Sequence, residues 1–205
     1  MAELRGSGKA LWHQGWYRFA RQRPCTHWGA RPDGAHIDLV LLHSISLPPG
    51  IYGGPEVDQL FTGQLDSGAH PYFAQLAGLQ VSAHFFVRRG GELWQYVSCD
   101  ARAWHAGRSQ HGARTNCNDF SIGIELEGLE GQDFEAAQYD TLNALLPALA
   151  QAYPIAHVAG HEHVAPGRKH DPGAGFDWAL LQKAQGMATQ CFPEAVHAQL
   201  AQRNF

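Results

Sequence analysis

The stretch SIGIELEG at residues 121–128 decides the fold of this chain. Its positions alternate strictly, with isoleucine or leucine at 122, 124 and 126, and serine, glycine or glutamate at 121, 123, 125 and 127. Such alternation predicts a β-strand with one apolar face against a core. At least one of the two carboxylates, Glu125 or Glu127, should then lie at the margin of the buried sheet. A carboxylate there is costly to desolvate unless it is paired or functional.

Glu125 is the more informative of these two acids. Gly123 lies on the same face of the predicted strand, and its missing side chain leaves room beside the Glu125 carboxylate. The ordinary explanation for an acid in such a strand is a salt bridge or an exposed surface. That explanation fits Glu127 better than Glu125.

Further strands are predicted before this one. Residues 37–42 (IDLVLL) form an apolar run typical of a buried strand, and the run leads directly into His43. Residues 81–87 and 92–97 are rich in Val, Phe, Trp and Tyr around a Gly-Gly turn. This pattern predicts an antiparallel hairpin.

Helices are predicted between and after the strands. A short helix should cover residues 55–61, which begin with proline. Leucines at helical spacing predict a longer helix over 134–153, with Asp133 as its N-cap. Pro147 should kink this helix or limit its regularity. A last helix should begin near Asp177. Interleaved helices and strands with one hairpin indicate an α/β fold with a mixed central β-sheet and helices packed on it.

Composition favours one globular domain. The 205 residues, 44% of them hydrophobic, suit a single domain over 1–205, with a core at about 15–185 and short terminal extensions. A net charge of −4 gives no electrostatic reason to expect a nucleic-acid partner. No apolar run reaches the roughly 20 residues that span a bilayer, so no membrane partner is expected.

The N-terminal residues and the cysteines bear on the compartment. Residues 1–24 mix charges with aromatics and do not have the pattern of a signal peptide, which predicts a cytoplasmic protein. The four cysteines are widely separated and form no C-x-x-C pair. We expect free thiols in a reducing compartment.

The segment GHEHVAPGRKHDPG at residues 160–173 concentrates possible metal ligands. A zinc site needs three protein ligands and an open position for water. Lys169 and Asp171 are two residues apart, so in an extended segment both would face one cavity. The alternative for this segment alone is a solvated surface turn. Likewise, a single histidine at a strand end, such as His43, is more often structural than a ligand.

Six motifs in order carry a resemblance that spans about Gly15 to Trp178. They are HSISLPPGIYGGPEVDQLFTG, HPYFAQL, VSAHFFVRRGGELWQYV, RAWHAG, CNDFSIGIELEG and GHEHVAPGRKHDPG. Together they closely resemble the AmpD-type 1,6-anhydro-N-acetylmuramoyl-L-alanine amidases. These belong to a wider zinc amidase family that includes phage lysozyme-type amidases and peptidoglycan recognition proteins.

The resemblance implies one Zn²⁺ per chain, bound by His43, His161 and Asp171. It implies that Glu125 orients and deprotonates the attacking water, and that Lys169 stabilises the transition state. The implied fold is that of the zinc amidases and peptidoglycan recognition proteins.

Other residues in the motifs are expected to line the substrate groove without binding the metal. These are Tyr72, His84 and His105. Three positions depart from the family pattern: Ser44 replaces Asn, Gln80 replaces Arg, and Asn116 stands where Arg or another residue precedes CNDF. A lost Arg is a lost carboxylate clamp, so looser recognition of the stem peptide is expected. The tail after about Met187 matches none of the family motifs.

The implied reaction is hydrolysis of the bond between (1,6-anhydro-)N-acetylmuramic acid and L-alanine in small muropeptides, during cell-wall recycling. Two alternatives remain at this point. A lytic peptidoglycan amidase would share the chemistry. A non-catalytic peptidoglycan-binding module would share the fold, although a complete set of ligands argues against it.

Overall fold

The computed structural model describes residues 11–202, and its centre is a six-stranded mixed sheet in the order β12-β5-β11-β6-β7-β3. The four strands from β12 to β6 run parallel, β7 is antiparallel to β6, and β3 is parallel to β7. The strands are β3 (Arg21–Gln22), β5 (Leu39–Ile45), β6 (Phe85–Val87), β7 (Leu93–Gln95), β11 (Ser121–Glu127) and β12 (His157–Gly160). The predicted α/β class with a mixed central sheet is confirmed.

The helices and the smaller ladders surround this sheet. The helices are α1 (Glu56–Thr62), α2 (Pro71–Ala74), α3 (Ala136–Ala152), α4 (His161–Val164), α5 (Trp178–Gln185) and α6 (Glu194–Gln202), with 3-10 turns η2 (Cys117–Asp119) and η3 (Thr189–Cys191). Three two-stranded ladders pair β1 (Trp12–His13) with β2 (Trp16–Tyr17), β4 (Trp28–Gly29) with β8 (Arg102–Ala103), and β9 (Gln110–His111) with β10 (Arg114–Thr115).

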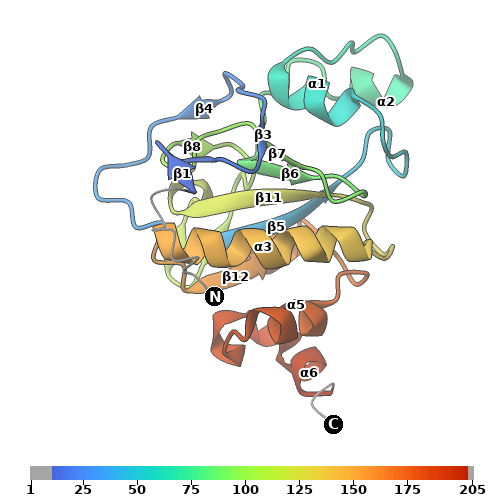
Figure 1. The fold of residues 1–205 in the computed structure, drawn as a ribbon. Helices are drawn as coiled ribbons and strands as arrows, with labels where there is room; N and C mark the ends of the chain where they lie inside the picture. Colours follow the sequence, from blue (N-terminus) through green and yellow to red (C-terminus); the bar gives the residue numbers. More distant parts are fainter. Residues whose placement is uncertain (1–10, 203–205) are drawn as a thin grey trace, which may run out of the picture.

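Helix α3 lies along one face of the sheet (Figure 1). Leu142, Leu145 and Leu149, at helical spacing, are fully buried against the apolar face of β11. Burying such a side chain contributes about 1.5–3 kcal/mol, so these leucines stabilise the packing of the helix on the sheet. One detail of the prediction was wrong. The N-cap is Glu135, which forms a capping box with the side chain of Gln138. Pro147 lies inside the helix, as the sequence places it.

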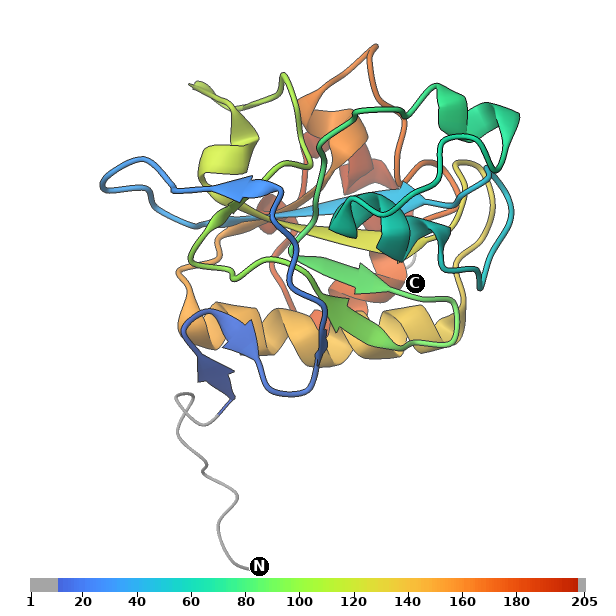
Figure 2. The same cartoon turned by 90° about the horizontal axis from the view of Figure 1, so that it is seen from above.

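The second face of the sheet is covered as well. Residues 101–120 and helix α4 lie on the side opposite to α3 (Figure 2). A second apolar cluster forms there from Leu39, Leu41, Ala106, Cys117, Phe120, Ala159 and Val164. Every residue of β11 is therefore buried, including both Glu125 and Glu127. Of the two explanations offered for Glu127, an exposed surface is excluded, because other chain segments cover the polar face of the strand, and the salt bridge is described below.

The predicted hairpin forms, with shorter strands than expected. Phe85, Phe86 and Val87 pair with Gln95, Trp94 and Leu93, and the outer residues of both runs leave the ladder. Helix α1 begins directly after Pro55, as the prediction had it.

The C-terminal tail packs on the core. Asp177 caps α5 by accepting a hydrogen bond from a backbone N–H of its first turn, which confirms the predicted start of that helix. Phe192, Val196 and Leu200, from the segment around α6, are buried in the same apolar cluster as Trp178. The tail thus extends the core beside β12.

The four cysteines are free, as predicted, and three of them are buried. Among residues 11–202, no helix combines the length and apolar character needed to cross a membrane. Residues 1–10, on which part of the expectation about the N-terminus rests, lie outside the described residues.

Candidate metal centre and its cavity

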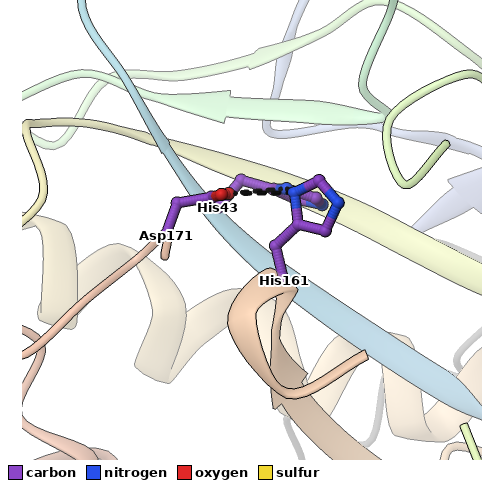
Figure 3. A group of neighbouring side chains, drawn as sticks. All are labelled: His43, His161 and Asp171. Carbon is purple, nitrogen blue, oxygen red and sulfur yellow. Dashed lines mark hydrogen bonds and ion pairs between the residues drawn. The ribbon is translucent and has the colours of Figure 1, made fainter. Parts of the chain in front are cut away.

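Three side chains predicted as metal ligands converge at one edge of the sheet (Figure 3). His43 lies near the carboxyl end of β5, His161 follows β12 directly, and Asp171 lies on the loop after α4. Neighbouring parallel strands present their carboxyl ends at the same edge, so the topology brings residues far apart in the sequence together. All three side chains are buried.

The donor atoms of these residues form a nearly equilateral triangle. His43 Nδ1 lies 3.0 Å from His161 Nδ1 and 3.0 Å from Asp171 Oδ2, and His161 Nδ1 lies 3.1 Å from Asp171 Oδ2. In a tetrahedral zinc site with bonds of about 2.0–2.1 Å, ligand atoms are separated by roughly 3.3 Å. The spacing of the three atoms therefore fits a zinc ion.

Hydrogen bonding determines which nitrogen of His161 faces the centre with a lone pair. His161 Nε2 lies 3.0 Å from the carbonyl oxygen of Ala106, which can only accept, so the ring proton is on Nε2 and Nδ1 is bare. Burial lowers the pKa of His43 to about 4, so this ring is neutral at neutral pH. Neutral imidazoles are the form that binds metals.

Asp171 supplies the negative charge of the centre. Burial raises the pKa of this carboxyl, whereas hydrogen bonds donated from the two Nδ1 positions would lower it below its ordinary range. A cation at the centre takes the place of those protons. The loop is fixed by a hydrogen bond from the backbone N–H of Glu162 to the carbonyl oxygen of Asp171. An ionised oxygen and an imidazole lone pair, both desolvated and 3.1 Å apart, favour a cation between them.

Glu125 lies beside the candidate metal ligands because of strand register. In the parallel pair of β11 and β5, Glu125 is the direct partner of His43. Burial raises the pKa of Glu125 well above its ordinary value, the charge of Asp171 raises it further, and Lys169 opposes both. Within residues 11–202, its Oε2 atom is buried without a hydrogen-bond partner. A desolvated carboxylate beside a metal site can act as a base.

A cavity of about 300 Å³ opens over this edge, and both the candidate ligands and Glu125 line it. Lys169, Tyr72 and His105 also line it. Apolar side chains also line the cavity, among them Leu47, Leu60, Leu76, Leu79, Val81 and Trp104. The sequence analysis did not identify this apolar part of the wall. Trp104 was the one detectable signal, because it directly precedes His105 in the RAWHAG motif.

His84, which was expected to line the groove, lies behind the cavity and outside its lining. The side chain is fully buried, its Nδ1 accepts from the backbone N–H of Gly123 at 3.0 Å, and its Nε2 donates to the carbonyl oxygen of Ala101 at 3.1 Å. Burial, reinforced by the charge of Arg31, lowers the pKa of His84 to about 3. The ring is a neutral link between β11 and the segment that covers it.

Of the three departures from the family pattern, only Ser44 touches the cavity. Gln80 is exposed and lies outside it. Asn116 is also exposed and has a φ of 57° at the start of η2. Asn is one of the few non-glycine residues that adopt this left-handed conformation readily, so its backbone geometry accounts for it.

The carboxylate of Glu127 is held by backbone N–H groups and lies near an arginine. Its carboxylate accepts hydrogen bonds from the backbone N–H groups of Gly53 at 2.6 Å and Arg89 at 3.0 Å, and Arg88 lies 3.7 Å away. The predicted salt bridge is thus present, and Glu127 joins the loop before α1 to the hairpin.

Replacing Glu127 with Gln is expected to lower stability without impairing chemistry. An amide group in this buried position turns one acceptor into a donor facing a backbone N–H, which should cost about 1–3 kcal/mol in the free energy of unfolding. Zinc content and turnover per folded molecule should stay near wild type. Denaturant titration and a turnover assay on the same sample check both points, and a large loss of turnover in fully folded protein would contradict this assignment.

Comparisons with known proteins agree with this geometry. Residues 33–174, which contain the cavity, match the family described as N-acetylmuramoyl-L-alanine amidase. The chain is 53% identical over 174 residues to the 1,6-anhydro-N-acetylmuramyl-L-alanine amidase AmpD of Escherichia coli (strain K12), a match that covers 84% of this chain and 95% of that protein.

Solved structures show the same relationship. The crystal structure of a selenomethionine derivative of AmpD matches with a TM-score of 0.82 and 52% identity, over 85% of this chain and 98% of that one. The complex of the N-acetylmuramyl-L-alanine amidase AmiD from E. coli with anhydro-N-acetylmuramic acid-L-Ala-D-gamma-Glu-L-Lys matches with a TM-score of 0.56 and 29% identity. That match covers 77% of this chain and 61% of the AmiD chain.

Proposed function

Because the chain belongs to the N-acetylmuramoyl-L-alanine amidase family, we propose that it hydrolyses the amide bond between 1,6-anhydro-N-acetylmuramic acid and L-alanine in small muropeptides. The chain is a hydrolase of the amidase class. The observation that carries the proposal is the convergence of His43, His161 and Asp171 in a cavity that also holds Glu125. We assign the activity to a single amidase domain with its core at about residues 15–185.

We propose Zn²⁺ as the metal, one ion per chain. Two imidazole nitrogens and one carboxylate oxygen are a ligand set that zinc accepts in catalytic sites, and three protein ligands leave a position open. A zinc ion held there would supply Lewis acidity, lowering the pKa of a water toward about 7 and polarising the scissile carbonyl.

The chain's own residues then have distinct roles in the proposal. Glu125, desolvated and with a raised pKa, takes the proton of the attacking water and passes it to the leaving L-alanine nitrogen. Lys169 lines the same cavity and stabilises the negative charge that develops on the carbonyl oxygen. Tyr72 and His105 form the cavity wall, where we propose that Tyr72 contacts the substrate.

The substrate is inferred from the relatives and from the size of the cavity. The AmpD enzyme of E. coli is named for 1,6-anhydro-N-acetylmuramyl-L-alanine, and the AmiD complex contains an anhydro-muramyl tripeptide. A cavity of about 300 Å³ suits a fragment of this size better than a cross-linked network. We place the reaction with recycled wall fragments in the cytoplasm, in line with the sequence resemblance.

Soluble anhydro-muropeptide should be hydrolysed much faster than insoluble sacculi. In the fragment, the lactyl carbonyl can reach the buried centre, whereas in cross-linked murein the same bond is embedded in a bulky polymer. Positioning of this kind can account for about 7–11 kcal/mol of a barrier. Initial rates on both substrates at equal bond concentration, read by mass spectrometry, check this. Tri- and tetrapeptide forms should be cut at similar rates.

The same assay separates the alternatives. Rapid solubilisation of sacculi would favour a lytic peptidoglycan amidase. Tight binding of the fragment without any release of L-alanine-terminated peptide, by protein that contains zinc, would favour a non-catalytic binding module.

A further inference from the structure

The ring of His105 lies between the ligand His43 and strand β11. His105 Nδ1 is 2.9 Å from His43 Nε2, the nitrogen that points away from the metal centre. We infer that His105 is a positioning residue that fixes the ring proton of His43 on Nε2, so that Nδ1 presents a lone pair to the metal. This inference rests on the proposed function.

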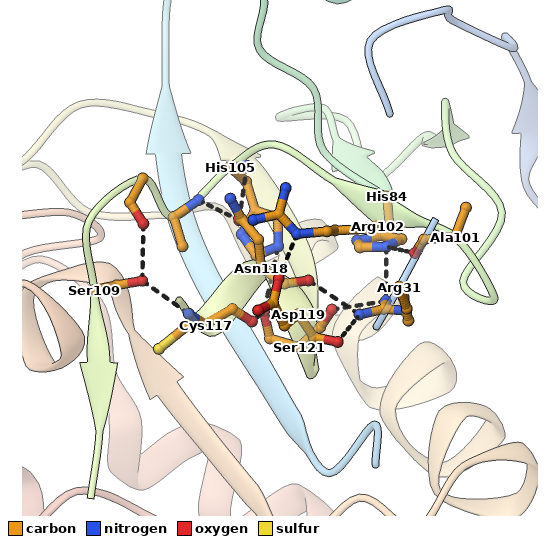
Figure 4. Close-up of polar contacts among 12 residues, drawn as sticks. Arg31, His84, Ala101, Arg102, His105, Ser109, Cys117, Asn118, Asp119 and Ser121 are labelled. Atoms are coloured by element: carbon orange, nitrogen blue, oxygen red, sulfur yellow. Dashed lines mark hydrogen bonds and ion pairs between the residues drawn. The ribbon is translucent and has the colours of Figure 1, made fainter. Parts of the chain in front are cut away.

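The direction of the hydrogen bond between His43 and His105 is set by a series of contacts that ends at the carbonyl oxygen of Cys117 (Figure 4). The hydroxyl of Ser121 donates to the carbonyl oxygen of Cys117 at 2.6 Å, so towards His105 it can only accept. His105 Nε2, 3.3 Å from that hydroxyl, therefore carries the proton, and His105 Nδ1 is bare. A bare Nδ1 accepts from His43, which places the His43 proton on Nε2.

The opposite tautomer of His43 would oppose metal binding. With its proton on Nδ1, His43 would donate to Asp171 Oδ2 at 3.0 Å, and the two residues would form a closed hydrogen bond. A cation would have to displace that proton to bind. By holding the proton on the outer nitrogen, His105 keeps the site in its metal-binding form.

Strand β11 is shaped to admit the His105 ring. A Cβ atom built at Gly123 would lie 2.5 Å from both Cγ and Nδ1 of His105, closer than real contacts allow. The room left by Gly123, which the sequence suggested lies beside Glu125, is occupied by this ring. A glycine inside a strand often marks such a close approach.

The segment that carries His105 provides the hydrogen-bond partners for the outer nitrogens of both histidine ligands. Asn118 Oδ1 accepts from the backbone N–H groups of His105 at 3.1 Å and Ala106 at 2.8 Å. The carbonyl oxygen of Ala106 is the partner of His161 Nε2. The outer nitrogens of both ligands thus bind adjacent residues held by a single amide side chain. Outer partners of this kind change metal affinity by about 10- to 100-fold.

The test compares His105→Asn with His105→Phe. Asn places an oxygen close to the position of Nδ1 and can still accept from His43, whereas Phe fills the slot beside Gly123 without an acceptor. Zinc affinity of each metal-free protein is measured by competition with a chromophoric chelator. We expect about 10- to 100-fold weaker binding for His105→Phe and a value within about threefold of wild type for His105→Asn. His111→Phe, a partly buried histidine outside the cavity, is the matched control and should bind zinc as wild type does.

The outcomes distinguish this inference from the proposed function. Wild-type protein that binds no zinc would refute the proposed function. Wild-type protein that binds zinc, with both His105 variants unchanged or both equally weakened, would refute the role of the Nδ1 acceptor. A measurement on the unaltered protein guards against misfolded variants: ring ¹⁵N spectra of the metal-free chain should show the proton on Nε2 of both His43 and His105. A proton on Nδ1 of His43 would overturn the inference.

Discussion

Replacing His43, His161 or Asp171 with Ala should abolish both zinc binding and amidase activity. The three donor atoms lie within 3.1 Å of one another, and removal of any one leaves two ligands, too few for a catalytic zinc site. Wild-type protein should gain about 4 kcal/mol of stability when free zinc is 1,000 times the Kd, whereas the variants should gain almost nothing. Elemental analysis and thermal unfolding with and without zinc measure both effects.

Two controls make this result specific. In the absence of zinc, the variants should unfold near the temperature of the metal-free wild type, which separates loss of the metal from loss of the fold. Glu127→Gln should retain zinc although its own stability falls. Full zinc content in two of the three alanine variants would rule out the triad as the metal site.

The central strands were predictable because their signals are local. The apolar run at 37–42 and the alternation at 121–127 predict two strands directly, and both form as β5 and β11. Their parallel pairing, and the register that places Glu125 next to His43, depend on a partner strand that periodicity does not identify. Pairing of strands distant in sequence is set by the topology of the whole sheet.

Burial on the second face was the main point that the sequence did not reveal. Alternation indicates which side of β11 is polar, but it does not show whether that side faces water or another chain segment. At Glu127 it faces the loop before α1 and the hairpin, whose backbone N–H groups at Gly53 and Arg89 donate to the buried carboxylate. Even polar positions in a strand can be fully buried when hydrogen bonds satisfy them.

At the site, too, the sequence indicated which residue types are present but not where the fold places them. Spacing alone does not join His43 to His161 and Asp171, and the predicted ligand set depended on motifs that resemble a known family. Those motifs did not separate His105, at the cavity wall, from His84, which is bonded to backbone groups behind it. A histidine in either environment looks the same in sequence, because only the neighbours differ.

Glu125→Gln should lower turnover by about 10²- to 10⁴-fold while zinc remains bound. The amide has the size of the carboxyl group but cannot accept the proton of the attacking water. Because the pKa of Glu125 is raised, the dependence of wild-type activity on this carboxylate should appear as a rise in kcat/KM with pH as the carboxyl ionises. That rise should be absent in the variant. Loss of zinc from Glu125→Gln would instead identify Glu125 as a metal ligand, and wild-type turnover would remove it from the mechanism.

The same substitution should stabilise the metal-free protein, with a sign that follows from linkage. The folded state binds the Glu125 proton more tightly than the unfolded chain does, because burial, and then the charge of Asp171, raise its pKa. The stability this contributes is fully present below the unfolded-state pKa and is lost as the pH rises through the folded-state pKa. Gln resembles the protonated carboxyl group at every pH, so metal-free Glu125→Gln should unfold at a higher temperature than metal-free wild type at pH 8. The difference should shrink at pH 4, where both side chains are neutral. Equal unfolding temperatures at both pH values would mean that Glu125 is not held in a desolvated position, and the basis for its role as the proton acceptor would be lost.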